Sequence, residues 1–201
     1  MAENFPDQRA SEIVAISADQ LERRVAERIT AALEVLPRAL ATSCYGLSLV
    51  LHENESDPAR FRVDVRLNTE AQVAGIMYEG VAPDEARWSL DHWVDVVLWD
   101  LDATNPMGDI ERQLNGWLSA ERRLHGELVG EQGRRFVHRI REVLGRVGAI
   151  LHDSGSIERV FGRSVPVIVQ GPESGPWAKE ITAHANPWAS KTERRKWFAA
   201  A

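Results

Sequence analysis

The feature that most constrains this fold is a pair of neighbouring segments in which apolar residues occupy every second position. Over residues 44–51, the larger apolar side chains are Tyr45, Leu47, Leu49 and Leu51. The second segment alternates Phe61, Val63, Val65 and Leu67 with Arg60, Arg62, Asp64 and Arg66. Because a period of two is that of a β-strand, we expect a half-buried antiparallel hairpin with an acidic loop over residues 52–59. Its polar face should be either solvated or covered by charged partners.

Helical periodicity appears on both sides of the hairpin. A capping-box pattern, Ser17 with Gln20, precedes an apolar stripe of helical period that ends before Pro37. A second such pattern, Thr69 with Gln72, precedes another apolar stretch directly after the hairpin. The hairpin is therefore expected to lie between two helices with well-defined starts.

The strongest helical signal covers residues 134–151, with apolar residues on one face and an arginine-rich set on the other. Gly145 and Gly148 permit close approach by a neighbouring element, at a cost of about 1 kcal/mol each in helix propensity. Residues 165–169 indicate a third strand, with Pro166 at its start or on a sheet edge. We therefore expect an α+β fold in which a small, mostly antiparallel sheet, the hairpin plus this later strand, packs with several helices.

These patterns divide the chain into three parts. Residues 1–16 are an N-terminal lead-in, residues 17–188 a single α+β domain, and residues 189–201 a basic aromatic tail containing KTERRKWF. A chain of this length buries roughly 70% of its unfolded surface, which is enough for an ordinary hydrophobic core.

Composition excludes several classes of protein. The 44% hydrophobic and 27% charged residues are ordinary for a soluble globular chain. With no run of 18 apolar residues and no secretory signal pattern, we expect no membrane association and a cytoplasmic location. Cys44 is the only cysteine, so an internal disulfide and a cysteine-based zinc site are excluded. We expect no cofactor and no metal.

The net charge of −6 conceals an asymmetry between the two halves of the chain. Residues 1–110 carry 20 acids and 9 bases, whereas residues 111–201 carry 10 acids and 15 bases. The halves can complement each other inside one fold, or an acidic face can meet a basic partner protein. The overall sign disfavours nucleic acid as a partner.

The segment over residues 84–111 concentrates tryptophans and acids. Six of its residues form the expected partner-binding surface: Trp88, Asp91, Trp93, Asp95, Asp100 and Asp102. Aromatic anchors of this kind dominate many interfaces. The alternative for the tryptophans is that they pack in the core. Whether residues 94–101 form a strand or a short buried helix is open, because periodicity does not separate the two.

Within this segment, VVLWDLDAT resembles the first motif of the haloacid dehalogenase superfamily of phosphohydrolases. The resemblance implies Asp100 as the nucleophile, Asp102 as the acid/base and Mg²⁺ as the metal. The context differs, because about 95 residues precede the motif. The strand that should end in an acidic pair instead ends in Gln170-Gly171. A magnesium-dependent phosphohydrolase is therefore the alternative hypothesis.

Two other interpretations apply to the same aspartates. Asp100, Asp102, Thr104 and Glu111 have calcium-loop spacing, but Asn105 stands where that loop needs glycine. Alternatively, Asp100 and Asp102 cap the following helix or pair with arginines of the second half. The six histidines show no HxxxH or HExxH spacing, and no GxSxG occurs.

Three separated pieces of the chain resemble a bacterial family known as domain of unknown function 4303. They are the hairpin ending in Asn68-Thr69-Glu70, the pair Trp88 and Trp93, and the strand at 165–169 followed by a helix ending in Ala185-Asn186-Pro187. Together they span about residues 20–188. The activity of that family is not established, so the resemblance implies no catalytic residues.

We therefore expect a bacterial cytoplasmic protein that binds another protein and is not an enzyme. Its partner would be basic, for example a toxin that it neutralises as an immunity protein, by analogy with similar small α+β proteins. The oligomeric state is open at this point.

Overall fold

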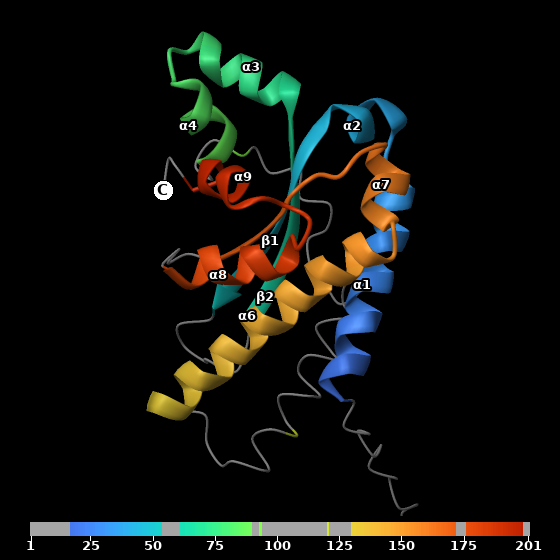
Figure 1. The fold of residues 1–201 in the computed structure, drawn as a ribbon, viewed down its shortest axis with the longest axis vertical. Helices are drawn as coiled ribbons and strands as arrows, with labels where there is room; N and C mark the ends of the chain where they lie inside the picture. The colour runs from blue at the N-terminus through green and yellow to red at the C-terminus, as the bar shows by residue number, and fades with distance from the viewer. Residues whose placement is uncertain are drawn as a thin grey trace, which may run out of the picture.

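The computed structural model describes residues 17–53, 61–89, 93, 120, 130–171 and 176–198, and their fold is α+β (Figure 1). Its strands are β1 (Cys44–Glu53), β2 (Phe61–Thr69) and β3 (Val167–Gln170). The described helices before β3 are α1 (Ala18–Glu34), α2 (Arg38–Ser43), α3 (Glu70–Tyr78), α4 (Pro83–Trp88), α6 (Gly130–Asp153) and α7 (Ser156–Phe161). After β3 come α8 (Pro176–Ala185) and α9 (Lys191–Lys196).

The sheet is mixed, with strand order β2-β1-β3. β1 and β2 form the expected antiparallel hairpin, in which Leu49 pairs with Val65. β3 runs parallel to β1, with Leu49 opposite Val169, so the expectation of a mostly antiparallel sheet was wrong. Side-chain alternation places residues on the two faces of a strand but does not give its direction. The long stretch of chain between β2 and β3 leaves either direction open.

The helices α1 and α3 begin where the capping-box patterns of the sequence predicted. Ser17 caps α1 and Thr69 caps α3, each through a complete capping box with a glutamine three residues later. α1 ends at Glu34, slightly before the expected end, and α6 begins at Gly130 rather than at residue 134. Pro166 directly precedes β3, and its carbonyl accepts a hydrogen bond from the Leu47 amide at 2.9 Å. The third strand therefore starts two residues later than the expected residue 165, with Pro166 just before it, and it lies at the edge of the sheet.

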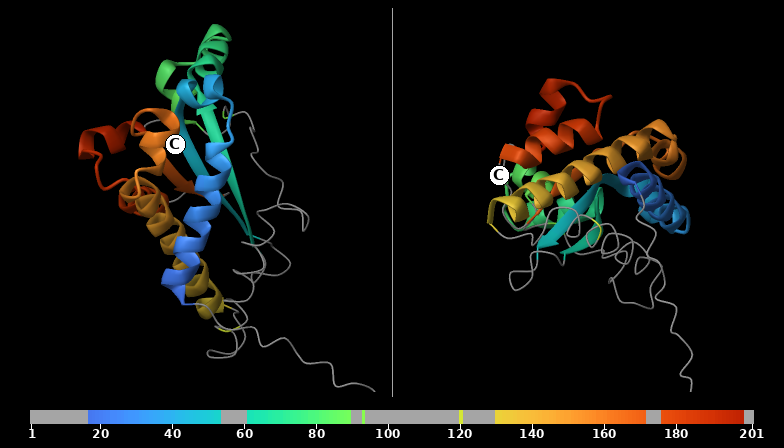
Figure 2. Two further views of the ribbon diagram at one scale, coloured as in Figure 1. Left: turned by 90° about the vertical axis from the view of Figure 1, so that its right-hand side faces the viewer. Right: turned by 90° about the horizontal axis from the view of Figure 1, so that it is seen from below.

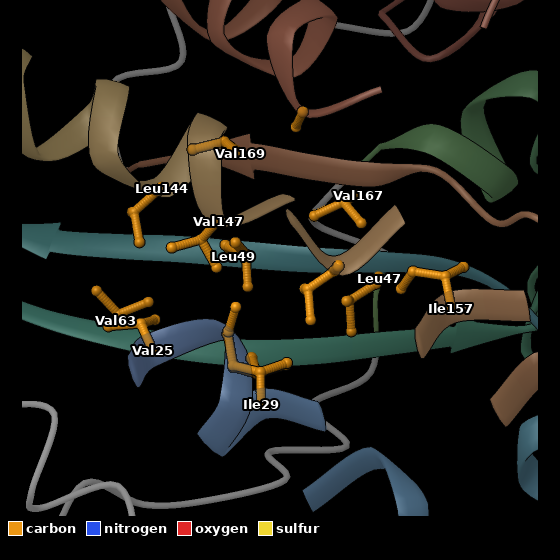
Figure 3. Close-up of a cluster of buried hydrophobic side chains, with 14 of the residues drawn as sticks. Val25, Ile29, Leu47, Leu49, Val63, Leu144, Val147, Ile157, Val167 and Val169 are labelled. Carbon is orange, nitrogen blue, oxygen red and sulfur yellow. The ribbon is translucent and has the colours of Figure 1, made fainter. Parts of the chain in front are cut away.

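The main core lies between the sheet and helices α1 and α6, which cover one of its faces, while α8 packs along the free edge of β3 (Figures 1 and 2). The strands contribute alternate residues, among them Leu47, Leu49, Val63, Val65, Leu67, Val167 and Val169. Figure 3 shows several of them beside Val25 and Ile29 of α1, Leu144 and Val147 of α6 and Ile157 of α7. The apolar alternation of the sequence is therefore the core-facing side of the sheet.

Two polar side chains, one in α8 and one directly after it, complete the hydrogen bonding of β3. Thr182 Oγ1 accepts a hydrogen bond from the Val169 amide at 3.0 Å, and the same oxygen lies 3.3 Å from the Val169 carbonyl oxygen. Asn186 Oδ1 accepts a hydrogen bond from the Val167 amide, and Asn186 Nδ2 donates one to the Val167 carbonyl, both at 2.8 Å. The backbone groups on the free edge of β3, which would otherwise be unpaired, therefore form hydrogen bonds with side chains of the same domain.

Within the described ranges, acids of the first half of the chain form ion pairs with arginines of the second half at two places. Glu22 of α1 and Arg146 of α6 meet at 2.6 Å, and Glu34 and Arg159 meet at 3.2 Å. Glu22 is buried, whereas both members of the second pair are about half exposed. At these two places, the charges of the halves complement each other inside the fold.

The C-terminal residues that the structure describes pack against the rest of the domain. α9 begins with a third capping box, formed by Ser190 and Glu193. Trp197 is 5% exposed and belongs to a second, smaller cluster of buried residues: Tyr45, Val73, Ala86, Trp93, Ile168, Ala189 and Trp197. We call this set the aromatic cluster. Trp197, which directly follows α9, thereby holds the end of this basic helix against the domain.

Candidate functional site

The structure describes two of the six residues expected to bind a partner, Trp88 and Trp93. Asp91, Asp95, Asp100 and Asp102 lie outside the described residues. The same holds for residues 94–101 as a whole, so whether they form a strand or a helix stays open.

Trp93 is enclosed by the fold and retains 4% exposure. A Cβ placed on Gly46 of β1 would lie 3.0 Å from the edge of its indole ring. The Arg87 carbonyl accepts two hydrogen bonds, one from Trp93 Nε1 at 2.9 Å and one from the Tyr45 hydroxyl at 2.7 Å. Trp88 meets Tyr45 edge to face, with ring centroids 5.4 Å apart. Trp93 therefore packs inside the domain and offers a partner very little surface, whereas Trp88 is only partly buried.

Arg87 joins α4 to the start of α3. Its guanidinium donates to both carboxylate oxygens of Glu70, at 2.8 and 2.6 Å, and lies 4.4 Å from the centre of the Tyr45 ring. This bidentate hydrogen bonding holds the pKa of Glu70 below its usual value. Burial raises the pKa of Tyr45, so its hydroxyl remains a donor at neutral pH. The two short helices are thus fixed to β1 as a unit.

The outer surface of α3 is apolar and exposed. Val73 is the one residue of this helix that is buried. Its exposed residues after Glu70 are Ala71, Ala74, Gly75, Met77 and Tyr78, which we call the α3 surface. Tyr78 is 94% exposed and Met77 is 41% exposed. A helix that is apolar around its circumference is normally buried, so an exposed one indicates a site of interaction.

Acidic side chains border the α3 surface. Glu79 follows the helix directly, and Asp84 and Glu85 lie in the first turn of α4; all three are exposed. The nearest arginine in the sequence, Arg87, is already held by Glu70. α3 and α4 project at one end of the molecule, beyond the hairpin (Figure 1). The projecting end therefore combines an apolar helix with a negatively charged border.

The sheet face opposite the main core carries a buried polar strip that the sequence indicated only in part. Asp64 of β2 is 1% exposed, and its Oδ2 lies 2.6 Å from His52 Nε2 and 3.7 Å from an Arg66 nitrogen. Gln170 Nε2 donates to Ser48 Oγ at 2.6 Å. The charged face predicted for the hairpin is thus present, and its aspartate is shielded from solvent.

The buried polar strip does not form a catalytic triad, because Ser48 is too far from the His52–Asp64 pair to act as its nucleophile. Ser48 and His52 are four residues apart on one strand, a separation of roughly 13 Å at the usual strand rise. Cys44 is buried, and burial raises the pKa of its thiol to about 11, so it is protonated at neutral pH. Among the described residues, no group of three His, Cys, Asp or Glu side chains is placed to hold a metal ion.

No family model matches this chain, and no curated protein or solved structure matches it either. None of the helices in the described ranges has the length and hydropathy needed to cross a bilayer. Among the described residues, the α3–α4 end combines an exposed apolar helix with an acidic border, as a protein-binding surface does.

Sequence reasoning missed the α3 surface. The capping box at Thr69 and the apolar residues behind it predicted the helix, and such a run normally predicts burial. The signal that could have revealed the surface is the spread of apolar residues around α3, since Ala71, Val73 and Ala74 do not share one narrow face.

Proposed function

We propose that this protein is a non-enzymatic protein-binding module and that the α3 surface is where it binds. The observation that carries the proposal is Tyr78, which is 94% exposed at the end of an apolar helix. Tyrosine is enriched among the residues that dominate binding energy, because its ring buries a large area and its hydroxyl keeps a hydrogen bond.

The occupant we propose is a basic protein. Glu79, Asp84 and Glu85 border the α3 surface, and a partner with a positive border would be attracted toward it. Burial of Tyr78 and Met77 against an apolar patch of the partner would then supply the stabilising contact. Ala71, Ala74 and Gly75 leave space for a partner helix to approach closely.

The narrower form of the proposal is a bacterial cytoplasmic immunity protein that neutralises a basic toxin. It rests on the analogy drawn from the sequence and on the acidic border around α3. The resemblance to domain of unknown function 4303 is compatible with this role. Asp91, Asp95, Asp100 and Asp102, which lie outside the described residues, are the other acids proposed to bind the partner.

The test uses the products of the two reading frames that adjoin this gene, each co-expressed with the tagged protein. We expect one of them to be basic and to co-purify. Tyr78→Ser should weaken that complex by about 2 kcal/mol or more, measured by titration calorimetry. Val35→Ser is the matched control, because Val35 is 79% exposed but lies at the end of α1. Val35→Ser should leave the affinity unchanged.

Three outcomes would overturn the proposal. The first is that neither neighbouring product binds. The second is an affinity that Tyr78→Ser leaves intact. The third is a homodimer that dissociates in Tyr78→Ser, which would assign the α3 surface to self-association. Separately, magnesium-dependent hydrolysis of a phosphate ester that disappears in the double variant Asp100→Ala and Asp102→Ala would favour the phosphohydrolase alternative.

A further inference from the structure

A basic groove lies between α8 and α9, on a part of the molecule that the proposed function does not use. It has a volume of about 320 Å³ and is lined by Lys179, Ala183, Lys191, Arg194, Arg195 and Phe198. Four of these six residues are cations, and no acidic side chain of the described residues lines the groove. The overall chain is acidic, so the concentration of positive charge here is local.

The sequence and the packing of α9 together produce this arrangement. Lys191, Arg194 and Arg195 follow the i, i+3, i+4 spacing that places side chains on one face of a helix. Trp197, buried in the aromatic cluster, holds the end of α9 against the domain. The carboxylate of Glu193 accepts a hydrogen bond from the Ser190 amide at 2.8 Å, so this acid caps the start of α9 and does not line the groove.

Two contacts fix side chains of the groove before any ligand arrives. Arg194 donates to the Ala183 carbonyl of α8 at 3.3 Å, which joins the two walls. The Lys179 ammonium lies 5.8 Å from the centre of the Phe198 ring, which positions that cation over the aromatic side chain. The four cations that line the groove repel one another, and an anion that binds between them reduces this repulsion.

We propose that the α8–α9 groove binds a small soluble polyphosphate, either inorganic or carried by a nucleotide. Its four cations match the charge of a triphosphate, and arginine and lysine are the side chains that proteins use to hold phosphate groups. A hollow of about 320 Å³ accommodates a molecule of that size. The site is separate from the α3 surface and does not depend on the proposed function.

The fold disfavours the other polyanions that such a patch attracts. A membrane-bound α9 would need a free apolar face, but Trp197 is 5% exposed within the aromatic cluster. Nucleic acid would have to approach a chain with a net charge of −6. A small polyphosphate contacts only the locally basic groove, and salt screens it from the more distant acidic side chains.

The test is titration calorimetry of the full chain with inorganic triphosphate and, in a second arm, with ATP. We expect saturable 1:1 binding that weakens as salt increases. In the variant carrying Lys191→Gln and Arg195→Gln, the affinity should fall at least about tenfold, because two charge-assisted contacts are lost. The matched control is Arg134→Gln with Arg135→Gln, which removes the same charge from the exposed start of α6.

Thermal unfolding of each variant shows whether it folds. If the groove variant unfolds early, Lys179→Gln alone replaces it, because Lys179 lies on the other wall of the groove. Absence of saturable binding to either probe at millimolar concentration would overturn the inference. Equal loss of affinity in the α6 control would overturn it too, because binding would then follow net charge. Binding only to vesicles of anionic lipid would reassign the groove to a membrane surface.

Discussion

Gly148 of α6 and Ala185 of α8 approach so closely that a Cβ on the glycine would lie 2.5 Å from the alanine Cβ. The same Cβ would also lie 3.2 Å from Val167 of β3, so neither neighbour leaves room for it. Gly145, one turn earlier, faces Ile181 in a similar way at 2.9 Å. The two glycines therefore set the distance between α6 and α8, as the sequence predicted for a close approach.

We expect Gly148→Ala to destabilise the protein by about 1–3 kcal/mol, because one added methyl overpacks this crossing. Urea unfolding followed by circular dichroism measures the change. Gly75→Ala is the matched control, since it lies inside α3 and a Cβ there would meet no atom within 4 Å. That substitution should stabilise by about 0.5–1 kcal/mol through helix propensity. Unchanged or increased stability in Gly148→Ala would contradict the tight crossing.

The buried ion pair between α1 and α6 supplies the second prediction. Arg146→Gln leaves the carboxylate of Glu22, whose side chain is 7% exposed, without its partner at 2.6 Å. We expect a loss of about 1–2 kcal/mol, smaller than for a fully buried pair because the arginine is 48% exposed. Arg159→Gln removes the exposed pair with Glu34 and should cost about 0.5 kcal/mol or less. Equal losses in the two variants would show that burial of Glu22 is not what matters.

His152 predicts a pH dependence of stability. Burial lowers its pKa, against the opposing effect of the Asn186 side chain. Its Nε2 lies 3.1 Å from Trp188 Nε1 and 3.2 Å from Asn186 Oδ1. Because the pKa is lower in the folded chain than in the unfolded one, the unfolded state takes up the proton first as pH falls. Stability is therefore full above pH 6.5 and decreases as pH falls from there toward the lower folded pKa.

The measurement is the free energy of unfolding at pH 7.5 and at pH 5.5. His152→Gln should reduce the difference between the two pH values, because the titrating ring is gone. His184→Gln serves as the control, since His184 is exposed at the end of α8, and it should keep the difference. A pH difference that survives in His152→Gln would assign the effect to other groups.

Features that depend on neighbouring residues, such as helix starts, could be predicted from the sequence. Features that depend on packing between distant residues could not. Ser17 and Thr69 define helix starts through partners three residues away, so their capping boxes could be recognised in the sequence. The direction of β3 depends on a pairing between Leu49 and Val169, 120 positions apart, which alternation does not encode. The basic aromatic residues of the tail were visible, but their assembly into a groove depends on burial of Trp197. The exposure of Tyr78 likewise depends on what the rest of the chain leaves uncovered.

Asn186 provides the last prediction, because no local pattern marked it as part of the sheet. Its side chain is buried and makes three hydrogen bonds with the backbone, two with Val167 at 2.8 Å and one with the Thr182 carbonyl at 2.7 Å. Its Oδ1 also lies 3.2 Å from His152 Nε2. Asn186→Ala would leave the amide and carbonyl of Val167 unsatisfied inside the protein. We expect a loss of about 3 kcal/mol together with faster hydrogen exchange at the Val167 amide.

Thr42→Val is the control for that substitution, since Thr42 also bonds a backbone carbonyl but is exposed on α2. It should change the free energy of unfolding by no more than about 0.5 kcal/mol. Protection of the Val167 amide that persists in Asn186→Ala would mean that another group, or water, satisfies this edge. The combination of a large loss and local deprotection would instead show that the Asn186 side chain, directly after α8, completes the edge of the sheet.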